Sequence, residues 1–201
     1  MKITARAMGL IGLLGGAGGA INALLCYLKF PVDTGPHVPF PWHIIPAGGA
    51  HGALLAAIAA GCASAVWNQR AWMRWAAAPV VGWLSGWLSW IPLQLCLHPE
   101  VGINKAPLWP FVGNNFKETA WGLWQYFGLV GMLCFVGLQL LRRASPARRR
   151  PFLAVGIISG CLGSLWWWIE MKPWYFSLIH GTIWGSLVGY GVWKSQRAAK
   201  L

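Results

Sequence analysis

The sequence predicts an all-α integral membrane protein that forms a single polytopic domain over residues 1–201. Two observations predict this fold class. Hydrophobic residues make up 57% of the chain and charged residues only 10%, whereas about a quarter of the residues in a soluble domain are charged. The apolar residues also form runs long enough to cross a hydrocarbon core that is roughly 30 Å thick. About six transmembrane helices are expected, at residues 8–28, 44–67, 77–97, 119–141, 152–170 and 174–193.

The basic residues predict the orientation of these helices, because lysine and arginine are retained in cytoplasmic loops. With both termini in the cytoplasm, 12 of the 16 basic residues lie inside. The four that remain outside are Lys29, Lys105, Lys117 and Lys172. This plan favours the inner (plasma) membrane of a bacterium. The net charge of +12 is therefore interpreted as topology and not as a nucleic-acid surface, since the basic residues form short clusters between apolar runs.

Glycine spacing suggests that the six spans are three helical hairpins in tandem. Each odd-numbered span carries two glycines four residues apart. Each even-numbered span carries a His-Gly or Phe-Gly pair near its outer end. The middle hairpin is the weakest match, and chance similarity is a real alternative for it. The aligned glycines are Gly12 and Gly16, Gly82 and Gly86, and Gly156 and Gly160, and the outer pairs are His51-Gly52, Phe127-Gly128 and His180-Gly181.

Small residues at every fourth position predict close helix packing, because they let helix backbones approach where no hydrophobic drive brings helices together. The second span carries Gly48 and Gly52 on such a stripe, and the sixth carries Gly181, Gly185 and Gly189. These five glycines are predicted to serve helix packing.

Ionisable and amide side chains are costly in hydrocarbon, so they usually face the bundle interior or a watered cavity. Six such candidates lie within the expected spans, and all six fall in the outer half. This placement predicts a polar vestibule that opens to the outside above an inner half rich in glycine and alanine. The candidate ligand-binding residues are Asn22, His51, Gln94, Gln125, Glu170 and His180.

A second interpretation makes His51 and His180 ligands of a cofactor. Two histidines at one depth on equivalent helices could hold a b-type haem, with Gly52 and Gly181 leaving room for the macrocycle. The segment from Ala47 to His51 also resembles the Ala-xxx-His pattern of light-harvesting polypeptides, in which the histidine ligates a chlorophyll magnesium. A hydrogen bond from either histidine to a neighbouring helix is the plain alternative. No further metal site is predicted, because the cysteines stand alone.

No catalytic residue is predicted, because the chain contains no P-loop, HExxH or GxSxG motif. The run RRASPARRR at residues 142–150 is expected to be a tight cytoplasmic loop. It also suits anionic lipid headgroups, which attract basic residues near the membrane surface. Its basic residues are Arg142, Arg143, Arg148, Arg149 and Arg150.

Three functions remain open from the sequence. The favoured one is small-solute transport or solute binding at the outer vestibule. In size and helix plan the chain resembles the substrate-binding subunits of energy-coupling-factor transporters, although a threefold repeat is not part of that pattern. The alternatives are a haem- or chlorophyll-bearing subunit of an electron-transfer or pigment complex, and a non-catalytic assembly or scaffold subunit. Other membrane subunits are expected partners under all three.

Overall fold

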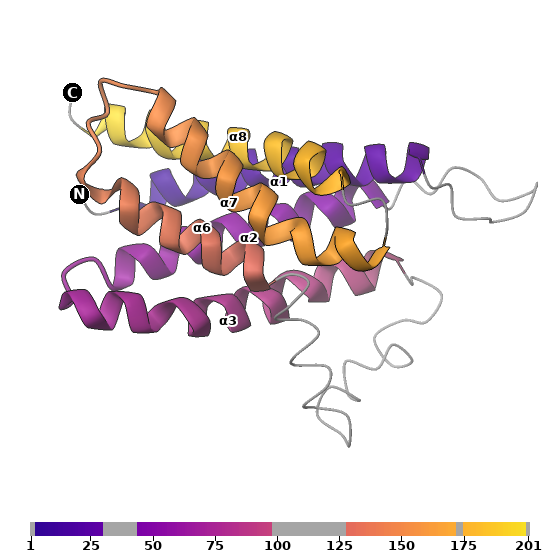
Figure 1. Cartoon of the computed structure of the whole chain (residues 1–201), viewed down its shortest axis with the longest axis horizontal. Coiled ribbons are helices and arrows are strands. Elements are labelled where there is room, and N and C mark those ends of the chain that lie inside the picture. The colour runs from indigo at the N-terminus through magenta and orange to yellow at the C-terminus, as the bar shows by residue number, and fades with distance from the viewer. Residues whose placement is uncertain (1–2, 30–43, 98–127, 172–174, 200–201) are drawn as a thin grey trace, which may run out of the picture.

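The computed structural model describes residues 3–29, 44–97, 128–171 and 175–199, which form six α-helices, one short 3-10 helix and no strand (Figure 1). The helices begin and end close to the expected spans within these residues. Their bounds are α1 (Ala5–Lys29), α2 (Ile44–Ala65), α3 (Ala71–Leu97), α6 (Leu129–Leu140), α7 (Arg150–Met171) and α8 (Phe176–Ala198), and the 3-10 helix η2 is Leu141–Arg143.

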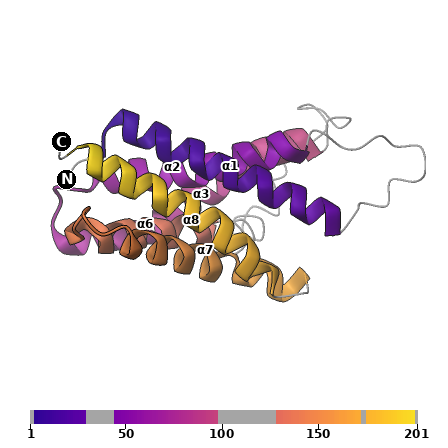
Figure 2. The same ribbon diagram turned by 90° about the horizontal axis from the view of Figure 1, so that it is seen from above.

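The six helices form a closed bundle. Each packs on the next, from α1 through α2, α3, α6 and α7 to α8, and α8 returns to α1. Helix α2 also contacts α6, so it lies towards the interior. Both termini lie at the same end as the α2–α3 and α6–α7 connections (Figures 1 and 2). We call this the basic end, because its described charged residues are Arg6, Arg70, Arg74, Arg142, Arg143, Arg148, Arg149, Arg150, Lys194 and Arg197. The opposite end is the far end.

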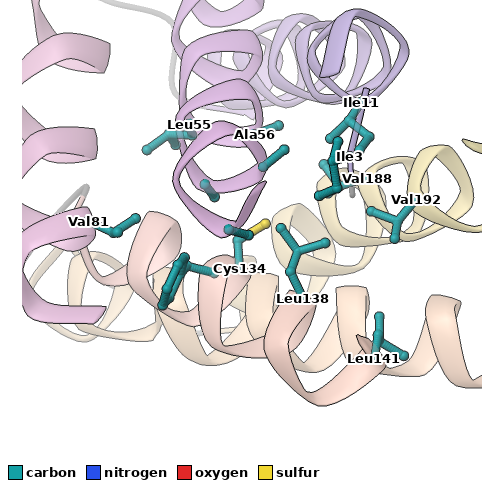
Figure 3. Close-up of a cluster of buried hydrophobic side chains, with 14 of the residues drawn as sticks. Ile3, Ile11, Leu55, Ala56, Val81, Cys134, Leu138, Leu141, Val188 and Val192 are labelled. Atoms are coloured by element: carbon teal, nitrogen blue, oxygen red, sulfur yellow. The ribbon is translucent and has the colours of Figure 1, made fainter. Parts of the chain in front are cut away.

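The core is built from small and medium apolar side chains (Figure 3). Alanines spaced at i, i+3, i+4 and i+7 form one face of α2, and this spacing is that of a helical stripe. The four alanines, Ala56, Ala59, Ala60 and Ala63, have no exposed surface. Phe135 of α6 and Ile11 of α1 fill the space around this face. The half of the bundle near the basic end is therefore packed mainly with alanine and aliphatic side chains.

Glycine brings two helix pairs into backbone contact. A Cβ added at Gly16 of α1 would lie 3.2 Å from the carbonyl oxygen of Gly49 on α2. A Cβ at Gly185 of α8 would lie 2.9 Å from the Cα of Ile157 on α7. The five glycines expected at packing stripes all lie at such approaches, since a Cβ at any of them would meet the backbone of the facing helix: Gly48, Gly52, Gly181, Gly185 and Gly189.

The α1–α2 and α7–α8 hairpins do not match contact by contact. Gly160 faces Gly181, whereas Gly16, which aligns with Gly160, faces Gly49 and Ala53. Gly52, which aligns with Gly181, instead faces Gly15 and Gly19. The two hairpins share glycine-mediated packing, but α1 uses a neighbouring face.

Two described segments are long and apolar enough to cross a membrane by length and composition, Ala5–Leu25 and Ile44–Ala65, and Arg150–Leu165 is a shorter apolar segment. A buried core helix or an N-terminal signal sequence has the same composition, so this finding is weak evidence for membrane association. Helix α6 is apolar but only 12 residues long, and the described parts of α3 and α8 contain several tryptophans, glycines and serines, which lower their mean hydropathy.

Candidate functional site

Three of the six candidate residues are described with their side chains, and all three lie in the half of the bundle near the far end: Asn22 on α1, His51 on α2 and His180 on α8. Gln94 and Glu170 lie on the last turns of α3 and α7 at the far end, but their side chains are outside the described part of the structure. Gln125 lies outside the described residues.

Asn22 joins α1 to α8 at the level of His180. Its side-chain Nδ2 donates a hydrogen bond to the carbonyl oxygen of His180 at 3.0 Å. The His180 ring is buried, and the ring of Phe176 lies edge-on to it at 5.5 Å between centroids. The structure therefore brings two of the predicted residues together, one through its backbone.

His51 joins α2 to α3. Its Nδ1 lies 3.0 Å from the carbonyl oxygen of Ser89, and a carbonyl can only accept, so Nδ1 carries the proton in this contact. Ser89 and Ser85 lie one turn apart on α3, and neither has exposed surface. This serine pair was not predicted from the sequence, although its i, i+4 spacing is a signal that could have revealed a polar face.

Trp184 is the residue on which the three helices α1, α2 and α8 meet. Its Nε1 donates a hydrogen bond to the carbonyl oxygen of Gly52 on α2 at 3.3 Å. A Cβ added at Gly18 of α1 would lie 2.9 Å from the Cα of Trp184. Trp184 lies one turn from His180 towards the basic end, and its indole reaches α2 one residue after His51. It was not predicted as a site residue.

The two histidines are not arranged as a pair around open space. His51 forms its hydrogen bond with α3. The space beside Gly52 and Gly181, which was expected to accommodate a macrocycle, is occupied by helix backbone. Gly52 lies against the backbone of Gly15 and Gly19, and Gly181 lies against the backbone of Cys161. Among the described residues, no three His, Cys, Asp or Glu side chains are grouped closely enough to hold a metal ion.

Polar residues are also buried outside the half of the bundle in which the vestibule was predicted. Gln139 of α6 is 7% exposed and Gln196 of α8 is 8% exposed, and both lie towards the basic end. Ser159 lies near the middle of α7, where its hydroxyl donates to the carbonyl oxygen of Leu133 at 3.0 Å. The half of the bundle expected to be rich in glycine and alanine therefore also buries two amide side chains.

A small cavity of about 20 Å³ lies between α6, α7 and α8. Its lining includes Leu138, Phe152, Val188 and Trp184, with Ser159 as a polar member. A cavity of this size holds about one water molecule. It is too small for a solute or a cofactor.

No known protein family matches the sequence, and neither a characterised protein nor a solved structure matches it significantly.

Proposed function

We propose that the chain is a six-span membrane protein that binds a small solute in the far half of the bundle, above Trp184. The observation that carries the proposal is that Asn22, His51 and His180, from three different helices, lie within about one helical turn of Trp184 along the bundle. Side chains able to donate and accept hydrogen bonds thus lie on three helices at one level, and solute sites between the helices of a bundle use polar groups placed in this way.

Exposed apolar side chains support the membrane placement. Leu13 of α1 is 71% exposed, Val80 of α3 is 63% exposed and Ile158 of α7 is 56% exposed. Helix α8 adds Leu178 and Ile179, which are 49% and 42% exposed. A soluble monomer rarely presents apolar surface on so many helices, whereas lipid covers it in a membrane.

The concentration of basic residues at one end supports the orientation. The four described inter-helix and terminal segments that carry arginine or lysine lie at the basic end, and the rule of positive cytoplasmic loops assigns that end to the cytoplasm. The far end, with the polar residues, then faces outside. This is the arrangement expected for a solute site that loads from the external medium.

Accessibility of the site to water tests this proposal. In a background with the native cysteines replaced by alanine, an Asn22→Cys variant is treated in intact cells with a membrane-impermeant thiol reagent. We expect it to react, and we expect the matched Ala60→Cys variant, from the packed inner half, to stay unreacted. An unreactive Asn22→Cys variant would mean that no outward vestibule exists.

The cofactor-bearing alternative has a separate readout. A Soret or chlorophyll-type absorption band in the purified protein, lost on replacing either His51 or His180, would establish that alternative and overturn the solute site. A scaffold subunit is distinguished from both, because it would show neither an absorption band nor a reactive Asn22→Cys variant.

A further inference from the structure

The loop between α6 and α7 is held against the end of α8. Trp193 of α8 donates its indole N–H to the carbonyl oxygen of Pro146 at 2.9 Å. The guanidinium carbon of Arg149 lies 6.0 Å from the centroid of the Trp193 ring, and that of Arg197 lies 5.6 Å from it. Within the loop, the backbone N–H of Arg148 donates to the carbonyl oxygen of Ser145 at 3.2 Å. The loop is therefore fixed to the bundle.

This fixed loop presents three adjacent arginines. Arg148, Arg149 and Arg150 are exposed, and with Pro151 they line a hollow at the surface. The acidic residue nearest in sequence, Glu170, is at the opposite end of α7, and the other three acidic residues lie outside the described residues. No carboxylate in the described part of the chain is placed to neutralise the three guanidinium groups.

We propose that Arg148, Arg149 and Arg150 bind the phosphate of an anionic lipid headgroup in the cytoplasmic leaflet. Guanidinium groups bind phosphate through paired, charge-assisted hydrogen bonds, and the cytoplasmic leaflet carries a negative surface potential. The proposal rests on the membrane placement proposed above.

Neighbouring side chains favour a lipid over a soluble polyanion. Trp193 lies beside the arginines, and tryptophan prefers the headgroup level of a membrane. Arg142 places its guanidinium carbon 4.8 Å from the ring centroid of a second tryptophan, Trp67. Leu140, on the turn of α6 that leads into the loop, is 61% exposed. An apolar side chain beside the basic loop suits a ligand that has both a phosphate and acyl chains.

The test measures thermal stabilisation of the purified protein in detergent micelles as phosphatidylglycerol or phosphatidylcholine is added. A charge-assisted hydrogen bond from a guanidinium group to phosphate contributes roughly tenfold in binding. The triple variant Arg148→Gln, Arg149→Gln, Arg150→Gln is therefore expected to need at least about a hundredfold more phosphatidylglycerol for the same stabilisation. The matched control is Arg6→Gln, Arg70→Gln, Arg74→Gln, which removes the same charge from the same end and is expected to behave nearly as the wild type.

A Trp193→Phe variant tests the role of the loop without changing the charge. It removes the indole N–H that holds Pro146, so we expect selectivity for phosphatidylglycerol to weaken while the protein stays folded. Equal losses in the two triple variants would show diffuse charge attraction and overturn the proposal. Full competition by inorganic phosphate would assign the arginines to a free anion and would also overturn it. Either failure leaves the membrane placement intact, because labelling of loop cysteines tests that placement independently.

Discussion

Trp184 donates its indole N–H to the carbonyl oxygen of Gly52 at 3.3 Å, and this bond joins α8 to α2. The two residues are separated by most of the chain, and the contact also places Trp184 against Gly18 of α1. One aromatic side chain thus links α8 to both helices of the α1–α2 hairpin, in a space that glycines provide. Larger residues at Gly18 would displace that side chain.

The Trp184 contact predicts a graded loss of stability. Trp184→Phe keeps most of the ring volume and removes the donor, so we expect a loss of about 1 kcal/mol in the free energy of unfolding. Trp184→Ala also leaves a cavity and is expected to cost about 3 to 5 kcal/mol. Denaturant unfolding in detergent measures both. Trp72→Phe is the control, because Trp72 is 65% exposed, and a Trp184→Ala protein as stable as this control would contradict the central role of Trp184.

Glycine packing makes a second prediction. At Gly185, an added side chain would meet the backbone of Gly156 and Ile157, and overpacking of this kind costs roughly 1 to 3 kcal/mol. We therefore expect Gly185→Leu and Gly52→Leu to lower the thermal midpoint in detergent. At Gly9, by contrast, an added Cβ has nothing within 4 Å, so Gly9→Leu is the matched substitution that should be tolerated.

The conservative change Leu187→Ile is expected to be nearly silent, because Leu187 lies off the glycine stripe and is only half-buried. A stable Gly185→Leu protein would place the stripe towards lipid, against the structure. If Gly185→Leu lowers stability and Gly52→Leu does not, the close α7–α8 contact is supported and the close α1–α2 contact at Gly52 is contradicted.

The two interhelical hydrogen bonds at the proposed site predict additive effects. A side-chain hydrogen bond between membrane helices contributes about 0.6 kcal/mol, so Asn22→Ala and His51→Ala are each expected to lower the free energy of unfolding by about that amount. The bonds join different helix pairs, so the double variant should show the sum. Strong coupling between them, measured in a double-mutant cycle on protein as purified, would indicate that one bound group contacts both residues.

The helices and their pairing could be predicted from the sequence, because long apolar runs and regular glycine spacing carry that information locally. The positions of the described helices agree with the expected runs, and Gly185 lies at a close helix contact as its spacing indicated. Which glycines face one another in each of the two outer hairpins could not be predicted. A helix rotated by one residue keeps its composition while it changes which glycine faces its neighbour, as Gly15 and Gly16 show.

The polar site was only partly predictable for a different reason. Histidine and asparagine stand out in an apolar helix, so Asn22 and His51 were identified from the sequence. Trp184 was overlooked because tryptophan is common in this chain and its partner is a backbone carbonyl, which leaves no trace in the sequence. Gln139 lies close to the basic end of its helix, where an amide is expected to reach water, whereas the structure buries it.

The last prediction concerns the number of spans, and two exposed residues in the second half of the chain decide it. If all six helices cross the membrane with both termini in the cytoplasm, Ser145 in the α6–α7 loop lies inside and Tyr175 at the start of α8 lies outside. If only α1 and α2 cross, both residues lie on the cytoplasmic side, because residues 71–199 then never leave it. In a cysteine-free background, an impermeant thiol reagent added to intact cells should therefore label Tyr175→Cys and spare Ser145→Cys.

Thr34→Cys and Asn104→Cys, which lie outside the described residues, should also be labelled, as Tyr175→Cys is, under the six-span plan. Disruption of the cells should expose Ser145→Cys, which controls for its reactivity. If neither residue is labelled before disruption, only two helices cross the membrane. If Ser145→Cys alone is labelled, the orientation is the reverse of the one proposed.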